Sequence, residues 1–345
     1  MLLLNLGIWI VQGRLIMRNI GLDLLKVFSC VGVIALHSSI TGFTLDNFNI
    51  SAYIYYLGTY SIPLFFMVNG YFLLNKRDLS IIYIRNKIIA ILYVVLFWNI
   101  LIWILKGDFY SNPIRKTLGS LLQRGYFYQF WFFGALILIY LLLPIIRKIL
   151  KKNNGYIILL LILTTIGIFI EIVNTFILYK PLQQYIPQTF RIWTWLFYYI
   201  MGGFLGEINI RKIEVNSIFK GAIIILLFIS PLILFYISKN IYHNIYAEYF
   251  YDSILIKVLS IGLFIIFVKK GEEYRFKHSK LVTEISALTM GVFIIHTYIL
   301  ELVWKYVDNK IWYNAVIAFI FTLSLSFIIS KLIWKMKRIR IFLKI

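Results

Sequence analysis

The segment RNIGLDLLKVFSCVGVIALHSSI, residues 18–40, carries the clearest structural signal in the chain. After Lys26 it runs for ten residues without a charged side chain before it reaches His37. A helix needs about 20 mostly apolar residues to cross the hydrocarbon core of a bilayer. The segment therefore predicts a membrane-spanning helix.

The whole chain has the same character. Of its 345 residues, 61% are hydrophobic and 14% are charged, and the mean hydropathy is +0.85. An ordinary soluble domain is about half apolar and about one quarter charged. Because a chain in lipid must satisfy its backbone polar groups internally, we expect an all-α, polytopic helical bundle in the cell (plasma) membrane.

The apolar runs predict about ten spans in one membrane domain, residues 18–345, preceded by an N-terminal tail, residues 1–17. The first dozen residues are apolar but too short to span, so we expect residues 1–16 to be an interfacial tail or a start-site artefact. The expected spans are 20–40, 53–74, 86–105, 130–147, 156–178, 193–206, 219–238, 253–268, 282–303 and 312–334.

Lys and Arg predict the orientation. With both termini inside, 25 of the 35 Lys and Arg residues fall in inner segments and 9 in outer loops, while Lys257 lies within a span. This bias is typical of a chain with cytoplasmic termini. The net charge of +21 comes from short clusters between apolar runs, which indicates contact with anionic membrane lipid and argues against nucleic acid.

Lys26 and His37 are the most informative polar residues of the first span. Eleven helical steps return to within about 20° of the starting direction, so both lie on one face, about 16 Å apart along the axis. Lys26 lies toward the inner end and His37 toward the outer end. Alternatively, Lys26 is a snorkelling lysine and His37 a structural hydrogen-bonding group.

Three further polar residues fall at the depth of His37. Glu171, Arg191 and His296 lie toward the outer ends of their expected spans. Ionisable groups in a membrane are costly and mark functional sites, so we expect the four to share a substrate pocket. Alternatively, Glu171 and Arg191 form an internal ion pair, and His296 braces the bundle.

Aromatic residues gather in the expected outer segments, and they fit an interfacial belt better than a sugar-stacking surface. They include Tyr53, Tyr55, Tyr56, Tyr126 and Tyr128.

Six motifs, in this order, resemble the acyltransferase-three family of membrane O-acyltransferases, particularly its surface-polysaccharide O-acetyltransferase branch. The third motif departs from the family's usual pair of spaced Arg residues, because it offers Arg85 and Lys87. The motifs are Arg18, Leu22-Asp23 and Lys26 followed by His37; PLFFMVNGYFL (63–73); YIRNK (83–87); WFFGALILIYLLLP (131–144); FYYIMGGFLG (197–206); and GVFIIHTYIL (291–300).

The resemblance implies transfer of an acyl group, most simply acetyl from acetyl-CoA, to a hydroxyl of an extracytoplasmic or lipid-linked polysaccharide. His37 would be the catalytic base or a covalent acyl carrier, since imidazole titrates near neutral pH. Lys26, Arg85 and Lys87 would bind coenzyme phosphates, unless Arg85 and Lys87 only set the topology. No metal is expected. The rival functions are a transporter or flippase, or a polymerase, for glycan intermediates.

Overall fold

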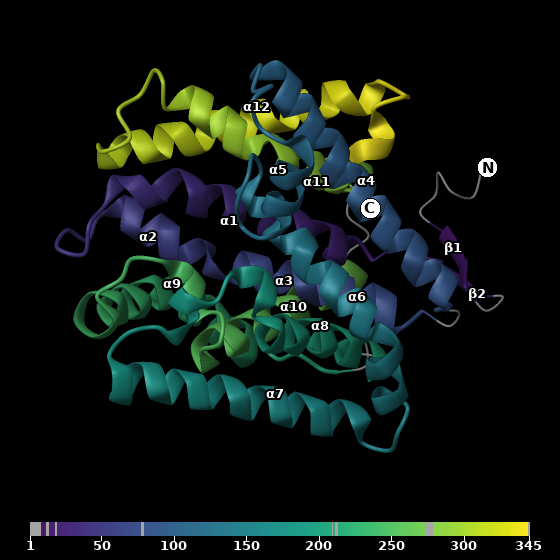
Figure 1. The fold of residues 1–345 in the computed structure, drawn as a ribbon. Helices are drawn as coiled ribbons and strands as arrows, with labels where there is room; N and C mark the ends of the chain where they lie inside the picture. Colours follow the sequence, from purple (N-terminus) through teal and green to yellow (C-terminus); the bar gives the residue numbers. More distant parts are fainter. Residues whose placement is uncertain are drawn as a thin grey trace.

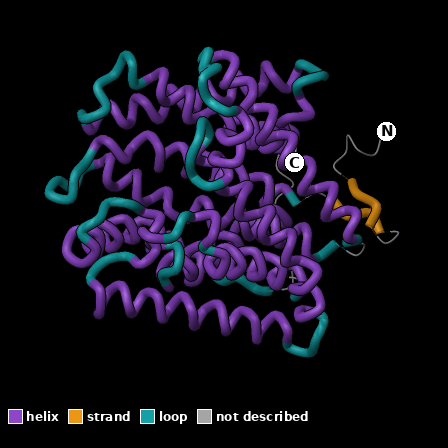
Figure 2. The backbone as a smooth tube through the Cα atoms, in the orientation of Figure 1, coloured by secondary structure: helices purple, strands orange, loops and turns teal. Residues whose placement is uncertain are grey.

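The computed structural model of this chain describes residues 8–11, 14–17, 19–76, 79–208, 210, 213–273 and 279–343. Within these residues it is a helical bundle with one small hairpin at its edge (Figures 1 and 2). The hairpin pairs β1 (Ile8–Val11) with β2 (Arg14–Met17) in antiparallel register, with Ile8 opposite Met17. It lies in the segment where we expected an interfacial tail.

The long helices follow the apolar runs, and short 3₁₀ and π turns extend or connect them. The α-helices are α1 (Ile20–Ser39), α2 (Ile50–Leu57), α3 (Ser61–Leu74), α4 (Ile81–Leu105), α5 (Pro113–Leu121), α6 (Trp131–Leu150), α7 (Gly155–Ile172), α8 (Ile192–Glu207), α9 (Ser217–Ile237), α10 (Ile254–Glu273), α11 (Ser279–Val303) and α12 (Trp312–Lys335). The 3₁₀ turns are Ile40–Gly42, Gly58–Tyr60, Tyr128–Phe130, Leu182–Tyr185, Gln188–Phe190, Ala247–Phe250 and Arg340–Leu343. The π turns are Val173–Leu178 and Ser238–Tyr242.

The all-α polytopic architecture is confirmed. In the described part of the chain, 8 helical segments are long and apolar enough to cross a membrane. One of them, Ile50–Leu74, joins α2 and α3 through a 3₁₀ turn. Helices α8 and α10 occupy the two remaining expected spans; α8 is short, at 16 residues, and α10 carries three lysines. The count of ten crossings stays a prediction.

Polar caps mark where several of these helices begin. The side chains of Asn19, Ser80 and Asn216 accept hydrogen bonds from first-turn amides of α1, α4 and α9. Such caps satisfy amides that have no partner within the helix. Each cap stands directly before an apolar run, which explains why hydropathy located these helices well.

Helix α1 lies at the centre of the bundle, in contact with α3, α10, α11 and α12. Helix α7 lies at one edge, at the bottom of Figure 1, and is largely exposed. The α1–α2 connection lies at the left of Figure 1, at the bundle end that holds the last turn of α1. We call this the His37 end, and the opposite end, where α1 begins, the Lys26 end.

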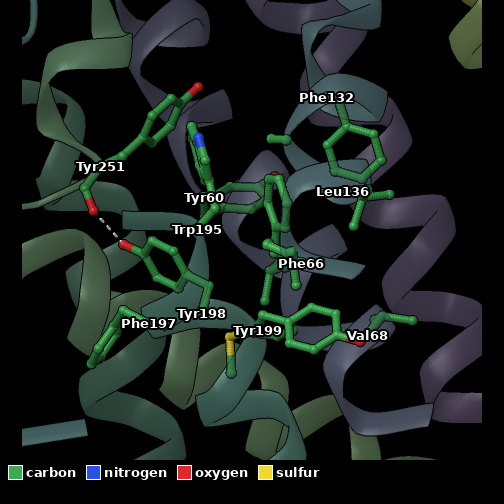
Figure 3. Close-up of a cluster of buried hydrophobic side chains, with 14 of the residues drawn as sticks. Tyr60, Phe66, Val68, Phe132, Leu136, Trp195, Phe197, Tyr198, Tyr199 and Tyr251 are labelled. Atoms are coloured by element: carbon green, nitrogen blue, oxygen red, sulfur yellow. Dashed lines mark hydrogen bonds between the residues drawn. The ribbon is translucent and has the colours of Figure 1, made fainter. Parts of the chain in front are cut away.

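Helices α3 and α8 cross closely because each presents a glycine to the other. A Cβ atom on Gly70 would collide with the carbonyl of Tyr199, and one on Gly202 with the carbonyl of Met67. Beside this crossing, Phe66 stacks on Trp195 with ring centroids 4.7 Å apart (Figure 3). The crossing fixes the position of α8, and so of Arg191, which directly precedes it.

Candidate functional site

A cavity of about 1020 Å³ opens at the His37 end of the bundle. Its walls come from the ends of α1, α6 and α11 and from the loops before α6, α8 and α10. His37 and Arg191 both line it, together with amide, hydroxyl and aromatic side chains. The cavity therefore joins residues that are far apart in the sequence into one polar chamber.

His37 lies in the last turn of α1 and is half-buried at the cavity wall. Its Nδ1 atom is 3.2 Å from the hydroxyl of Tyr128, which precedes α6. When Nδ1 carries the hydrogen and donates it to the Tyr128 oxygen, the Nε2 lone pair remains available. The imidazole can then accept a proton at Nε2 while Tyr128 holds its other side.

His296 lies on α11 and is fully buried beside His37, with ring centroids 5.1 Å apart. Its Nδ1 atom is 2.8 Å from the carbonyl oxygen of Phe293 and 3.2 Å from that of Val292. Because carbonyl oxygens only accept, Nδ1 carries the hydrogen. Its Nε2 atom then bears the lone pair, and it has no hydrogen-bond partner within the described residues.

The contact between α1 and α11 places this histidine pair. Nearer the Lys26 end, the Ser286 hydroxyl donates to Asp23 at 2.8 Å. Farther along, the Cys30 thiol lies 3.8 Å from the carbonyl oxygen of Thr289. Cys30 lies between Lys26 and His37 on their shared face of α1 and is buried, so this face points into the bundle.

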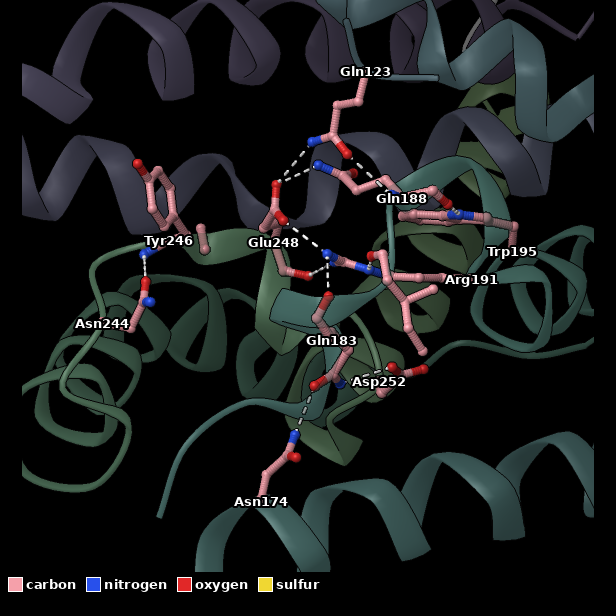
Figure 4. A network of polar contacts seen from close by, with 12 residues as sticks. Gln123, Asn174, Gln183, Gln188, Arg191, Trp195, Asn244, Tyr246, Glu248 and Asp252 are labelled. Atoms are coloured by element: carbon pink, nitrogen blue, oxygen red, sulfur yellow. Dashed lines mark hydrogen bonds and ion pairs between the residues drawn. The ribbon is translucent and has the colours of Figure 1, made fainter. Parts of the chain in front are cut away.

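Arg191 also lines the cavity, although its side chain is only 3% exposed, and it lies within a network of polar contacts (Figure 4). It pairs with Glu248 at 2.8 Å and donates to the backbone carbonyls of Gln183, Ile186 and Glu248 at 2.9–3.1 Å. Gln188 bonds the other oxygen of the Glu248 carboxylate. The pair is therefore neutral and held on all sides, which is typical of a structural buried ion pair.

Glu171 does not line this cavity. Its carboxylate, near the end of α7, accepts a hydrogen bond of 3.1 Å from the amide of Ile254. Arg191 instead pairs with Glu248, so the expected ion pair of Glu171 with Arg191 is not formed. Similar depth in the membrane does not bring Glu171 to the site, because α7 lies at the edge of the bundle.

The expected donor-binding residues lie toward the Lys26 end. Lys26 is 3.5 Å from the carboxylate of Asp23 and lies over the ring of Phe72. Arg85 is exposed on the second turn of α4, and Lys87 is half-buried near the ring of Tyr83. The structure thus places all three near one end of the bundle, with Lys26 against a different ring from Lys87.

Several residues that line the cavity are not predicted from the sequence. Tyr126 and Tyr128, which we read as interfacial, line the cavity, whereas Tyr55 and Tyr56 are buried in the core. Glu248 lies in the 3₁₀ turn that connects α9 to α10, and acidic residues are common in such connecting segments. No signal in the sequence distinguishes these aromatic and acidic residues from solvent-facing ones.

The loop before α6 forms part of the cavity wall and is held by a polar cluster. Asp108 accepts hydrogen bonds from Tyr126 and Ser111 and lies 3.6 Å from the amine of Lys116. These hydrogen bonds hold the pKa of Asp108 below its ordinary value of 3.8. The cluster ties the start of the loop to the cavity-lining Tyr126.

Comparison with known proteins places the chain among acyltransferases. The profile of an acyltransferase domain family matches residues 19–331. A protein of Enterococcus faecalis named amino-acid racemase is 23% identical over 354 residues, which cover 93% of this chain and 47% of that protein. The chain thus spans about half the length of this relative. No solved structure matches the present chain.

Proposed function

The chain belongs to the acyltransferase-three family, and on that premise we propose that it is a membrane O-acetyltransferase acting on a polysaccharide. It moves an acyl group, most simply acetyl, from cytoplasmic acyl-coenzyme A to a hydroxyl of an extracytoplasmic or lipid-linked glycan. The racemase activity named for the Enterococcus faecalis relative is not carried over, because the match accounts for 47% of that protein.

The position of His37 is the observation that carries this proposal. It is the last-turn residue of a central helix whose buried face leads back toward Lys26. It opens into the 1020 Å³ cavity and contacts the ring of His296. His37 therefore lies between the buried face of α1, which runs back toward Lys26, and the cavity at the opposite end of the bundle. This position suits a reaction whose two substrates approach from opposite ends of the bundle.

In direct transfer, His37 acts as a general base. Nε2 takes the proton of the glycan hydroxyl as its oxygen attacks the thioester carbonyl carbon. The carbon–sulfur bond breaks, and the leaving thiolate receives that proton from the imidazolium. The glycan gains an ester, and coenzyme A leaves as a thiol. Such proton transfer is typically worth about 10²–10⁴ in rate.

A covalent route uses the same residue. The Nε2 lone pair attacks the thioester carbon, the carbon–sulfur bond breaks, and coenzyme A is released as a thiolate. The glycan hydroxyl oxygen then attacks the acyl carbon, the carbon–Nε2 bond breaks, and the hydroxyl proton passes to the thiolate. In this route the acyl group passes from coenzyme A to the glycan while it is covalently bound to His37. Both routes need a neutral imidazole with its lone pair directed away from Tyr128.

The cavity offers groups suited to a sugar acceptor. Its volume of about 1020 Å³ is at the upper end of the range of about 300–1,000 Å³ for ligand pockets. Trp131 and Tyr249 provide apolar ring surfaces, and Gln184 and Thr297 provide hydrogen-bonding groups. Aromatic faces and amides of this kind match the apolar faces and hydroxyls of sugars.

The donor phosphates are assigned to Lys26, Arg85 and Lys87 near the Lys26 end. Along α1, Lys26 and His37 are about 16 Å apart at 1.5 Å per residue, a span suited to an extended pantetheine arm. Charged phosphates then stay at the membrane surface while the thioester reaches His37. The glycan pocket is assigned to the chamber that His37 and Arg191 line and that His296 adjoins; Glu171 has no part in this assignment.

Comparison of surface glycans from strains with and without this protein tests the function. The expected result is a mass difference of one acyl group per modified sugar, 42 Da for acetyl, released by mild base. Membranes containing the protein should also transfer label from acetyl-labelled acetyl-CoA to the glycan. Identical glycan masses in the two strains, together with no label transfer, contradict the proposal.

A further inference from the structure

A second cavity, of about 480 Å³, lies at the Lys26 end beside the turn between α6 and α7. Arg147, Lys151 and Lys152 line it, along with the carboxylate-bearing Glu207. A smaller cavity of about 200 Å³, against the start of α4, shares Arg147 and Lys151 with it. We propose that this pair of cavities, which we call the basic pocket, binds the phosphate group of a ligand at the membrane surface.

The balance of charge supports an anionic ligand. Counting Lys148 in the smaller cavity, the described residues that line the basic pocket include four cationic side chains and one carboxylate. Arg147 lies at the boundary between the two cavities, where its guanidinium donates to the backbone carbonyls of Leu79 and Lys76 at 3.1 and 3.3 Å. Phosphate oxygens are strong acceptors for such groups.

Helix α7 begins at the same place. Asn154 precedes its first residue with φ of 58°, and its side chain makes no capping hydrogen bond in this described turn. Tyr156 and Ile157, in the first turn of α7, line the basic pocket. The Gly155 amide donates to the carbonyl of Lys152 at 2.9 Å, whereas the next first-turn amides have no partner within the helix, and the helix dipole favours negative charge there. The cationic side chains and the first turn of α7 therefore both favour an anion in the basic pocket.

The surroundings of the basic pocket suit a phospholipid. From the pocket toward the bundle centre, α6 exposes Ile145 (59%) and Ile149 (36%), and α7 exposes Ile157 (48%) and Leu161 (61%). A lipid with its phosphate in the pocket would lay its chains on these apolar side chains. The nucleotide phosphates of coenzyme A are the other source of a phosphate group at the Lys26 end.

Two double variants test the site. Lys151→Gln with Lys152→Gln removes two charges from the basic pocket. The control, Lys331→Gln with Lys335→Gln, removes two exposed charges of α12 at the same end, outside either cavity. Thermal stability of the purified full chain in detergent is measured against added phosphatidylglycerol, phosphatidylcholine or coenzyme A. Lys152→Gln alone serves if the first variant fails to fold.

The expected result is stabilisation of the unmodified protein and the control by phosphatidylglycerol more than by phosphatidylcholine. The pocket variant should need tenfold to a hundredfold more phosphatidylglycerol for the same shift, as expected for lost charge-assisted contacts. A defect of that size toward coenzyme A instead identifies the donor as the source of the phosphate. Equal responses of the pocket variant and the control to both ligands overturn the proposal.

Discussion

The rings of His37 and His296 lie with their centroids 5.1 Å apart, although His37 is on α1 and His296 is on α11. Contacts along α1 and α11 fix this separation, and backbone carbonyls fix the hydrogen on Nδ1 of His296. The buried His296 therefore limits where the His37 ring can lie, and it presents an Nε2 atom without a hydrogen-bond partner in the described structure.

We expect His296 to act as a positioning residue for His37. An Asn at this position can still donate to the carbonyl of Phe293, but it lacks the ring that packs against His37. His296→Asn should therefore insert normally and lose about 10²-fold in turnover, because small displacements of a reacting group cost about that much. The measurement is kcat and KM for acyl transfer, with protein level as the control.

The kinetic pattern separates positioning from bracing. A positioning role lowers kcat with little change in KM for the acyl donor. Normal kcat in His296→Asn, with lowered protein level only in His296→Ala, would leave His296 as a brace for the bundle.

The donor assignment predicts a binding defect without a folding defect. Arg85 is exposed and Lys87 half-buried on α4, so replacing both by Ala should leave the helix intact. A charge-assisted contact to phosphate is worth about 1.5–3 kcal/mol. Acyl-coenzyme A affinity should fall by roughly tenfold to a hundredfold. Calorimetry on the purified variant checks this, and unchanged affinity assigns these residues to topology alone.

The loop at Asp108 should loosen in acid. Its hydrogen bonds depress the pKa of Asp108 in the folded protein, so they stabilise the loop fully above the ordinary carboxyl pKa. That contribution is lost as the pH falls through the depressed value. Limited proteolysis of the loop, followed from pH 6 to pH 3, should show cutting that rises at the acid end.

The Asp108→Ala variant provides the control for this loop. It should be cut readily at every pH, because it has no side-chain oxygen to accept hydrogen bonds from Tyr126 and Ser111. Equal cutting of the variant and the unmodified protein at pH 6 would show that the cluster does not hold the loop.

The helices were predictable because each long one coincides with an apolar run. The expected span 86–105 lies within α4, which begins earlier, at Ile81, after a Ser80 cap. The π turn that carries the α7 span on to Leu178 also fell inside a predicted span. Length and apolarity decide these elements locally, so no tertiary information was needed.

The composition of the site was only partly predictable. Hydropathy gives the depth of a residue in the membrane, but not which way it faces or which helix lies beside it. Glu171 shares the depth of His37, yet it lies against Ile254 and away from the cavity. Glu248 pairs with Arg191 from a distant loop, and only the folded arrangement brings these two residues together.

The orientation of the bundle is predicted from the Lys and Arg bias and can be measured directly. Reporter fusions after Lys152 and Lys280 should report the cytoplasm, and fusions near Asn47 and Asn309 should report the outside. The bias of 25 to 9 residues is the physical basis for this expectation. Reversed signals at any two of these sites would rule out the ten-span arrangement with cytoplasmic termini.

Acyl transfer by the His37→Gln variant is the most direct measurement of the proposed chemistry. Gln keeps a polar, hydrogen-bonding side chain beside Tyr128 and lacks a nitrogen that titrates near neutral pH. Glycan acylation is normalised to membrane protein and compared with that of the unmodified chain. We expect normal insertion and a loss of at least about 10²-fold in acylation. Acylation within a few-fold of the unmodified protein would contradict a catalytic role for His37.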